Sequence, residues 1–219
     1  MEFDIDEALR YLGVGKKAPD ELRQQVAATA EALTASVRPR YIYRVYDLEC
    51  GEGQISLCGS GVILSGRTAL EMLRECGRAV LLACTLGYAF DARLTAMQAR
   101  DMARAVILDV CGSVLVESGC DAAEQEIAEL FPSCYLTDRF SPGYGDLPLS
   151  LQPDLCAALD AERRLGVHVT ESLLMNPVKS VTAVIGLSDR PQMARIRGCA
   201  YCQMRETCAL RGEGKHCGN

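Results

Sequence analysis

The stretch RAVLLACTLG, Arg78–Gly87, is the part of this 219-residue chain that decides the fold. Between its first and last residues only Thr85 is polar, so the stretch lacks the alternation of a strand with one solvated face. An apolar run of this length that ends at a glycine predicts a strand buried on both faces, in the middle of a sheet.

More strands are predicted on the N-terminal side of this stretch. Residues 41–50 (YIYRVYDLEC) are rich in strand-forming side chains, and residues 54–66 predict a hairpin that turns at Gly59–Gly61. A short amphipathic helix is expected over residues 67–76. Together with Arg78–Gly87, these segments predict the larger part of a sheet.

Helices dominate the C-terminal side. Periodicity predicts one long helix from Asp91 to about Glu117, a shorter helix over residues 121–131 and another over residues 152–166. The β-branched residues of 180–185 predict a final strand. The buried stripe of the long helix is expected to include Leu94, Met102, Val106, Val110 and Val114.

Two helices are predicted before the sheet. The first begins after Asp4, an N-cap residue with Glu7 three positions later, and Gly13 is placed to end it. The second covers residues 18–37. Because strands and helices alternate irregularly, we predict an α+β fold: a single domain with a central twisted, mostly antiparallel sheet flanked by helices.

Composition and charge exclude several classes of protein. The chain carries a net charge of -6, without the basic face of a nucleic-acid-binding protein, and no run of 18 apolar residues that would span a membrane. Its first residues, MEFDIDEALR, are acidic and lack the apolar core of an export signal. We therefore expect a cytoplasmic protein that binds neither nucleic acid nor membrane.

Twelve cysteines fall into two groups. Eight are scattered through apolar segments, and reduced cysteine packs as a small hydrophobic residue, so we predict that these eight lie in the core: Cys50, Cys58, Cys76, Cys84, Cys111, Cys120, Cys134 and Cys156. The other four crowd into the last 21 residues. Such crowding in a reduced compartment points to a metal or a cluster.

The four C-terminal cysteines are Cys199, Cys202, Cys208 and Cys217, spaced C-x2-C-x5-C-x8-C. This spacing differs from that of bacterial ferredoxins and from the C-x3-C-x2-C of radical enzymes. We predict that all four ligate one centre in a tail of residues 191–219, an iron–sulfur cluster with zinc as the alternative. His216 is an alternative ligand.

Common catalytic motifs are absent from the sequence. It has no G-x-G-x-x-G after a strand, no phosphate-binding G-x-x-x-x-G-K-[ST] and no G-x-S-x-G. It has only two histidines, and His168 lies beside a predicted strand, where a structural role is expected.

A different candidate site is the segment RFSPGYGDLPLS, Arg139–Ser150, which we call the ribbon. Pro142 fixes a backbone angle, while Gly143 and Gly145 permit conformations barred to other residues. Tyr144 offers a flat face with a polar tip, and Arg139 offers a fork that matches a carboxylate or phosphate. The alternative is a plain tight turn with a solvated arginine.

The ribbon and the segment VTESLLMNPVKSV that follows it resemble the S-adenosylmethionine-binding activation domain of cobalamin-dependent methionine synthase. That family combines an Arg-x-x-x-Gly-Tyr ribbon with a Thr-Glu-Ser motif, a methionine, a proline and a Ser-Val strand. The matching positions here are Arg139, Gly143, Tyr144, Thr170, Glu171, Ser172, Met175, Pro177, Ser180 and Val181. The resemblance covers roughly residues 41–188, so residues 1–40 form a separate helical region and 41–190 an activation-like domain.

The resemblance implies a ligand and a set of contacts. Arg139 would hold the methionyl carboxylate of S-adenosylmethionine, and the backbone from Ser141 through Pro142 and Gly143 to Tyr144 would line the adenosyl group. Tyr144 would also face the corrin ring. Glu117, on the predicted long helix, is the candidate for the ligand's amino group.

The resemblance also implies a function shared with other proteins. The chain lacks the Asp-x-His-x-x-Gly signature of a cobalamin module, so cobalamin would come from a partner methionine synthase or corrinoid protein. A free-standing subunit of this kind would support reductive methylation of cob(II)alamin within a methyltransferase system, with an electron donor protein as a further partner. The alternatives are a non-catalytic docking scaffold with a structural zinc site, and a methyltransferase with another acceptor.

Overall fold

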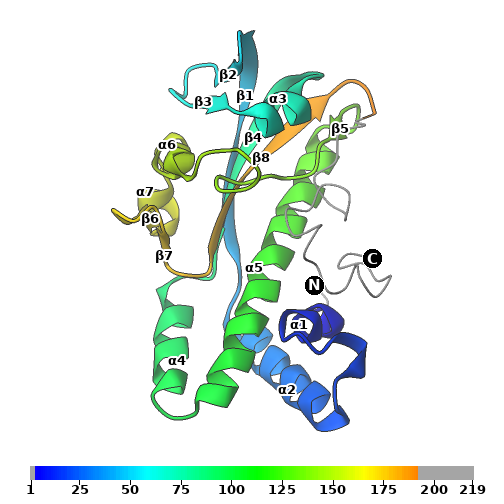
Figure 1. Ribbon diagram of the computed structural model, residues 1–219, viewed down its shortest axis with the longest axis vertical. Helices are drawn as coiled ribbons and strands as arrows, with labels where there is room; N and C mark the ends of the chain where they lie inside the picture. Colours follow the sequence, from blue (N-terminus) through cyan, green and yellow to red (C-terminus); the bar gives the residue numbers. More distant parts are fainter. Residues whose placement is uncertain (1–2, 192–219) are drawn as a thin grey trace. The chain divides into compact units, whose positions relative to one another are not determined.

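The computed structural model of the protein describes residues 3–191. Its core is a six-stranded sheet with the order β3-β2-β1-β4-β8-β5 (Figure 1). The bounds of these strands are β1 Arg40–Gly51, β2 Gln54–Leu57, β3 Ile63–Ser65, β4 Cys76–Thr85, β5 Tyr135–Leu136 and β8 Ser180–Ser188. Strand β4 is an interior strand, and its residues 79–84 are almost fully buried, as the apolar run predicted.

Antiparallel pairing joins neighbouring strands at both edges of the sheet. Strand β2 pairs with β1, where Leu48 opposes Leu57, and with β3, where Ile55 opposes Leu64. At the other edge β5 pairs antiparallel with β8. The predicted α+β class with a mostly antiparallel sheet is therefore confirmed, and so is the hairpin that turns at residues 59–61.

Seven α-helices lie in residues 3–191. Their bounds are α1 Ile5–Tyr11, α2 Asp20–Ser36, α3 Arg67–Leu73, α4 Tyr88–Gln98, α5 Met102–Leu130, α6 Gln152–Leu159 and α7 Ala161–Leu165. Two 3-10 helices (Gly15–Lys17 and Leu149–Leu151) and a small hairpin of β6 (His168–Val169) and β7 (Met175–Asn176) complete the fold. None of the helices described has both the length and the apolar character needed to cross a bilayer.

The described residues divide into two compact units. Unit 1 contains residues 3–42, residues 83–124 and residues 160–181, whereas unit 2 contains residues 43–82, residues 125–159 and residues 182–191.

Helix α5 fits closely against its neighbours in unit 1 because it carries glycine at two contact positions. A methyl group at Gly112 would overlap the buried ring of Phe90 in α4. A methyl group at Gly119 would lie 2.5 Å from Pro39 Cβ and 2.8 Å from Cys84 Sγ in β4. The absence of these side chains lets the helix backbone approach the sheet and α4.

In unit 2, helices α3 and α6 both contact one face of β8. Gln152 of α6 donates to Thr182 Oγ1 over 2.6 Å. Four residues along β8, a methyl group at Gly186 would lie 2.8 Å from Leu73 of α3. Side chains alternate along a strand, so positions 182 and 186 face the same side. Figure 1 shows α3 beside the short strands β2 and β3.

The predicted helix boundaries after β4 are wrong. In place of one helix over 91–117 and another over 121–131, the chain ends α4 at Gln98 and starts α5 at Met102. The break occurs because Asp101 caps the new helix, accepting a hydrogen bond from the Arg104 amide over 3.1 Å. Helix α5 then continues through Gly119, since the contact with Pro39 and Cys84 favours a glycine there.

Other predicted details need correction. The helix expected over 152–166 is divided into α6 and α7 at Asp160, which has a left-handed φ of 55°. Met102 and Val106, predicted in a buried stripe, are 62% and 49% exposed because the first turns of α5 present them to solvent. Asp4 caps α1 as predicted, whereas the Glu7 side chain pairs with Arg10.

The prediction that eight cysteines form core residues is correct for five of them. Cys76, Cys84, Cys111, Cys120 and Cys156 are buried. Cys134 is half-buried directly before β5, and Cys50 and Cys58 are exposed at the end of β1 and in the β2–β3 turn. These last two lie where the chain reverses direction, beyond the cover of the helices. All eight are free thiols.

Candidate functional site

The ribbon begins as an extension of the sheet in unit 2. After β5 the chain continues along β8, where Phe140 and Val184 exchange two backbone hydrogen bonds of 3.0 and 2.8 Å. Phe140 is buried, and side chains alternate along an extended chain, so Arg139 points to the opposite side and is half-buried. The sheet thereby fixes the backbone on which the guanidinium is carried.

The ribbon then forms a compact turn. The Tyr144 amide donates to Ser141 O over 3.0 Å, and the Gly143 amide donates to Leu147 O over 2.8 Å. Gly143 and Gly145 have φ values of 87° and 61°, in the left-handed region that favours glycine, as their positions predicted. Pro142 and Leu147 are buried, whereas Tyr144 is 37% exposed at the tip. The tip is therefore a hydrogen-bonded turn of defined conformation that exposes one aromatic ring.

The acidic residue next to the tip holds the ribbon to α3. Asp146 accepts hydrogen bonds from the amides of Arg67, over 2.6 Å, and Thr68, over 2.9 Å. The Thr68 side chain and these two amides hold the pKa of Asp146 at about 2, below the usual value for aspartate. The carboxylate is therefore charged at any ordinary pH and completes the first turn of α3.

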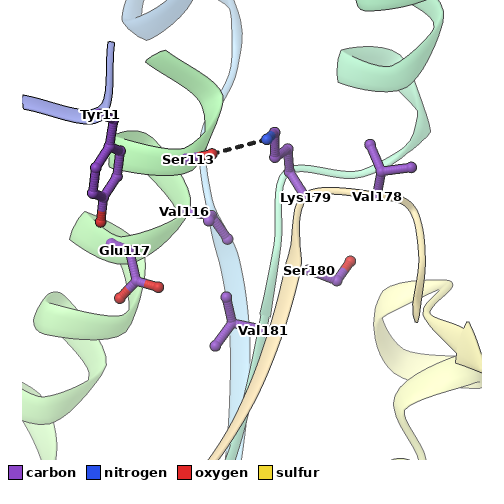
Figure 2. Close-up of a pocket in the computed structure, with 8 residues that line it drawn as sticks. All are labelled: Tyr11, Ser113, Val116, Glu117, Val178, Lys179, Ser180 and Val181. Atoms are coloured by element: carbon purple, nitrogen blue, oxygen red, sulfur yellow. Dashed lines mark hydrogen bonds between the residues drawn. The ribbon is translucent and has the colours of Figure 1, made fainter. Parts of the chain in front are cut away.

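Glu117, the predicted amino-group ligand, lies in unit 1. It lines a pocket of about 340 Å³ on α5, together with Tyr11 of α1 and residues 178–181, the segment that leads into β8 (Figure 2). Asp109, Ser113 and Glu117 follow each other at intervals of four residues, so they form one polar stripe along α5.

Lys179 is the cation of this pocket. Its ammonium group donates to Ser113 over 2.8 Å and pairs with Asp109 over 2.9 Å, while only 14% of its side chain is exposed (Figure 2). On the other wall, burial raises the pKa of Tyr11, and the charges of Glu7 and Glu117 raise it further. The Tyr11 phenol therefore stays protonated, and its hydroxyl is hydrogen-bonded to the Glu7 carboxylate.

The Thr-Glu-Ser motif forms the tip of the β6–β7 hairpin in unit 1. Thr170 and Leu174 close this turn with a backbone hydrogen bond of 2.8 Å. His168, expected to be structural, is half-buried on β6 and hydrogen-bonds through Nδ1 to Tyr88 over 3.1 Å. The hydroxyl of Ser180 shares a 2.8 Å hydrogen bond with Thr85. The motif thus forms a turn, and Ser180 separately ties the start of β8 to the end of β4.

Sequence reasoning missed Lys179, Tyr11 and Asp146. The i, i+4 spacing of Asp109, Ser113 and Glu117 was a signal for a polar stripe on α5. No local signal pointed to the Lys179 partner, which comes from a segment 66 residues away in sequence.

The predicted metal ligands Cys199, Cys202, Cys208 and Cys217 lie outside the described residues. Within residues 3–191 there is no group of three or more histidine, cysteine, aspartate or glutamate side chains that could hold a metal ion.

Comparison with known proteins gives a family match for the part of the chain that contains both the ribbon and Glu117. The model of the family "Vitamin B12 dependent methionine synthase, activation domain" matches residues 116–210. The predicted resemblance to this family is confirmed. The segment of this chain that matches the family includes the whole ribbon, the Thr-Glu-Ser turn and β8, together with three of the four C-terminal cysteines.

The fold of this chain is also found in a solved structure. The crystal structure of the MetH reactivation domain bound to AdoHcy superposes with a TM-score of 0.68 over 92% of this chain and 74% of that chain, at 16% sequence identity. At this identity the likeness shows a shared fold. Comparison with the curated proteins gave no match.

Proposed function

We propose that this chain binds S-adenosylmethionine at the ribbon and supports reductive methylation of cob(II)alamin held by a partner methionine synthase or corrinoid protein. The observation that carries the proposal is the ribbon itself. Its Arg139–Tyr144 part lies within the segment that matches the activation family, and buried residues anchor the ribbon at Phe140 and Leu147.

The groups on the ribbon fit this ligand. The Arg139 guanidinium presents paired donors to a carboxylate, which is the end group of the methionyl part. A side chain at Gly143 would meet only Leu149 within 4 Å, so the glycine leaves open space in which a ligand can approach the backbone. The exposed ring of Tyr144 offers a flat surface for an aromatic or corrin ring.

The proposed reaction transfers the sulfonium methyl group to cobalt. The C–S bond breaks with its electron pair retained by sulfur, so S-adenosylhomocysteine leaves, and one external electron completes the balance for cob(II)alamin. The role of this chain is to bind the methyl donor in a fixed orientation. Ordering two reactants in this way can supply about 7–11 kcal/mol of the barrier.

The first test is calorimetry of the full chain with S-adenosylmethionine. We expect one ligand per chain and binding that also occurs with S-adenosylhomocysteine, since the ribbon contacts proposed here do not involve the transferred methyl group. Glu117→Gln, measured in the same way, tests the predicted contact to the ammonium group. If the intact protein binds neither compound, the proposal is wrong and the docking scaffold takes its place.

The second test concerns the partner. Because no cobalamin signature occurs in the sequence, we expect methyl transfer only when a cob(II)alamin-bearing protein and a reductant are both present. The measurement is the appearance of S-adenosylhomocysteine, with the corrinoid protein omitted as the control. Efficient methylation of a small acceptor without any corrinoid would instead support a methyltransferase of another class.

We further propose that the four C-terminal cysteines form an iron–sulfur site that relays the required electron. Four thiolates suit such a cluster, and closely spaced exposed thiols without a ligand would be oxidised readily. We expect anaerobically purified protein to be brown, and replacement of Cys199 by serine to bleach it. Cys58→Ser is the matched control, because Cys58 is exposed but belongs to the β2–β3 turn.

Metal analysis decides between the two centres. Stoichiometric zinc without iron would rule out the relay and support a structural site. Truncation after Arg197 should leave S-adenosylmethionine binding intact with either metal, whereas only a cluster predicts that electron delivery to cob(II)alamin is lost.

A further inference from the structure

The ribbon and the start of α3 each contribute a glycine to the contact between them. A methyl group at Gly145 would overlap the Thr68 hydroxyl, and one at Gly66 would lie 2.9 Å from the Asp146 carbonyl oxygen. Both glycines have positive φ values, 61° and 99°. The two backbones therefore approach more closely than side chains would permit, and the Asp146 carboxylate occupies the centre of the contact.

The contact with α3 acts next to the exposed tip of the ribbon. Phe140 is paired with β8, and Leu147 is buried, but Tyr144 and Gly145 between them are exposed. Gly143 and Gly145, on either side of Tyr144, can each adopt backbone conformations barred to other residues, so the tip has more freedom before it is tied down. Asp146 follows directly, and its two hydrogen bonds to the amides of α3 limit rotation of this tip.

We infer that Asp146 is a positioning residue for the ligand site on the ribbon: its bonds to the Arg67 and Thr68 amides hold the tip in the binding conformation before the ligand arrives. This inference rests on the proposed function. A loop ordered in advance loses less conformational entropy when it binds, so its affinity is higher without any added contact. Asp146 acts through the backbone of Tyr144 and Gly145.

The decisive experiment compares Asp146→Ala with Asp101→Ala. Both substitutions remove an aspartate that caps a helix through backbone amides, α3 in the first case and α5 in the second. We expect Asp146→Ala to weaken S-adenosylmethionine binding by about three- to tenfold in calorimetry, on the order of the cost of immobilising one side chain when a ligand binds. Asp101→Ala should lower the unfolding temperature while leaving the dissociation constant within twofold.

Two further measurements separate positioning from general stability. Asp146→Asn keeps one acceptor oxygen of the pair, so its affinity should lie between those of the wild type and Asp146→Ala. Hydrogen exchange of the ligand-free protein should show faster exchange of the Gly143 and Leu147 amides in Asp146→Ala, since the ribbon turn opens when the contact with α3 is lost.

The pH dependence gives a further signature. The folded-state pKa of Asp146, about 2, is lowered from the ordinary 3.8, so its stabilising effect is complete above pH 4 and is lost as the pH falls toward 2. The difference in unfolding temperature between the wild type and Asp146→Asn should therefore be constant near neutral pH and shrink below pH 4.

The possible outcomes lead to different conclusions. If Asp146→Ala binds like the wild type, or if Asp101→Ala loses as much affinity, the positioning role is wrong. If the wild type does not bind S-adenosylmethionine, the proposed function fails, but the exchange measurement still shows whether Asp146 orders the ribbon. Unchanged exchange at Gly143 and Leu147 would overturn the inference independently of any ligand.

Discussion

Arg139→Ala should weaken the binding of S-adenosylmethionine by about 1.5–3 kcal/mol, the range for a hydrogen bond to a charged group. This corresponds to an increase of about 10- to 150-fold in Kd. The expected loss is large because Phe140, paired with β8 on both of its backbone groups, fixes the position from which the guanidinium reaches the ligand. Calorimetry on the full chain measures the effect.

Two comparisons make this prediction specific. Arg139→Lys keeps the positive charge but loses the planar fork, so it should recover only part of the affinity. Arg74→Ala removes an exposed arginine at the end of α3 and should bind like the wild type. Equal affinities for Arg139→Ala and Arg74→Ala would show that Arg139 does not contact the ligand.

Gly112→Ala should produce the largest loss of stability among single methyl additions in unit 1. The new methyl group would lie 2.7 Å from Phe90 Cε2 and overlap Cζ, and Phe90 is fully buried, so the ring has no free space into which to move. Overpacking of this kind costs about 1–3 kcal/mol, which exceeds the gain of at most about 1 kcal/mol from alanine in a helix. We expect an unfolding temperature lower by several degrees in calorimetry.

A control and a rescue variant complete this prediction. Gly77→Ala adds the same group on β4, where it would meet no atom within 4 Å, and should leave the unfolding temperature nearly unchanged. Phe90→Leu shortens the side chain that Gly112→Ala would strike, so the double variant should be more stable than the sum of the single effects predicts. Additive effects would contradict the steric explanation.

The sequence predicted those features that depend on local chemistry. The buried strand β4 followed from a continuous apolar run, and the hairpin turn from glycines spaced around Ser60. The left-handed backbone at Gly143 and Gly145 followed from the ribbon's composition. In each case a few adjacent residues determine the conformation, so a short segment is sufficient evidence.

Features that depend on distant contacts were missed. Helix α5 continues through Gly119 because Pro39 and Cys84 pack against it, and neither is near in sequence. The hydrogen bond between Lys179 and Ser113 also joins residues that are far apart in sequence, 66 positions in this case. The break between α4 and α5 is different: Asp101 is a recognisable N-cap, but the apolar period continues through it and hides the break in the sequence.

The composition of the site was predicted less completely than the fold. Arg139, Gly143 and Tyr144 were identified by a motif, and the structure shows a ribbon with a defined shape at these residues. Asp146 stands next to that motif, but its role is visible only with α3 in place, since its hydrogen-bond partners Arg67 and Thr68 are 79 and 78 residues away in sequence.

The close approach of the ribbon to the start of α3, at Gly66 and Gly145, has a consequence for how the protein can evolve. A side chain at Gly66 would push against the Asp146 backbone, and one at Gly145 would push against the Thr68 side chain. The loss of Asp146 would leave the first amides of α3 without their acceptor. Substitutions at Gly66, Gly145 and Asp146 should therefore be coupled during evolution. A change at one of these positions requires changes at the others or a different conformation of the ribbon turn. Related chains with a different continuation after Gly-Tyr should accordingly differ at the start of α3 as well.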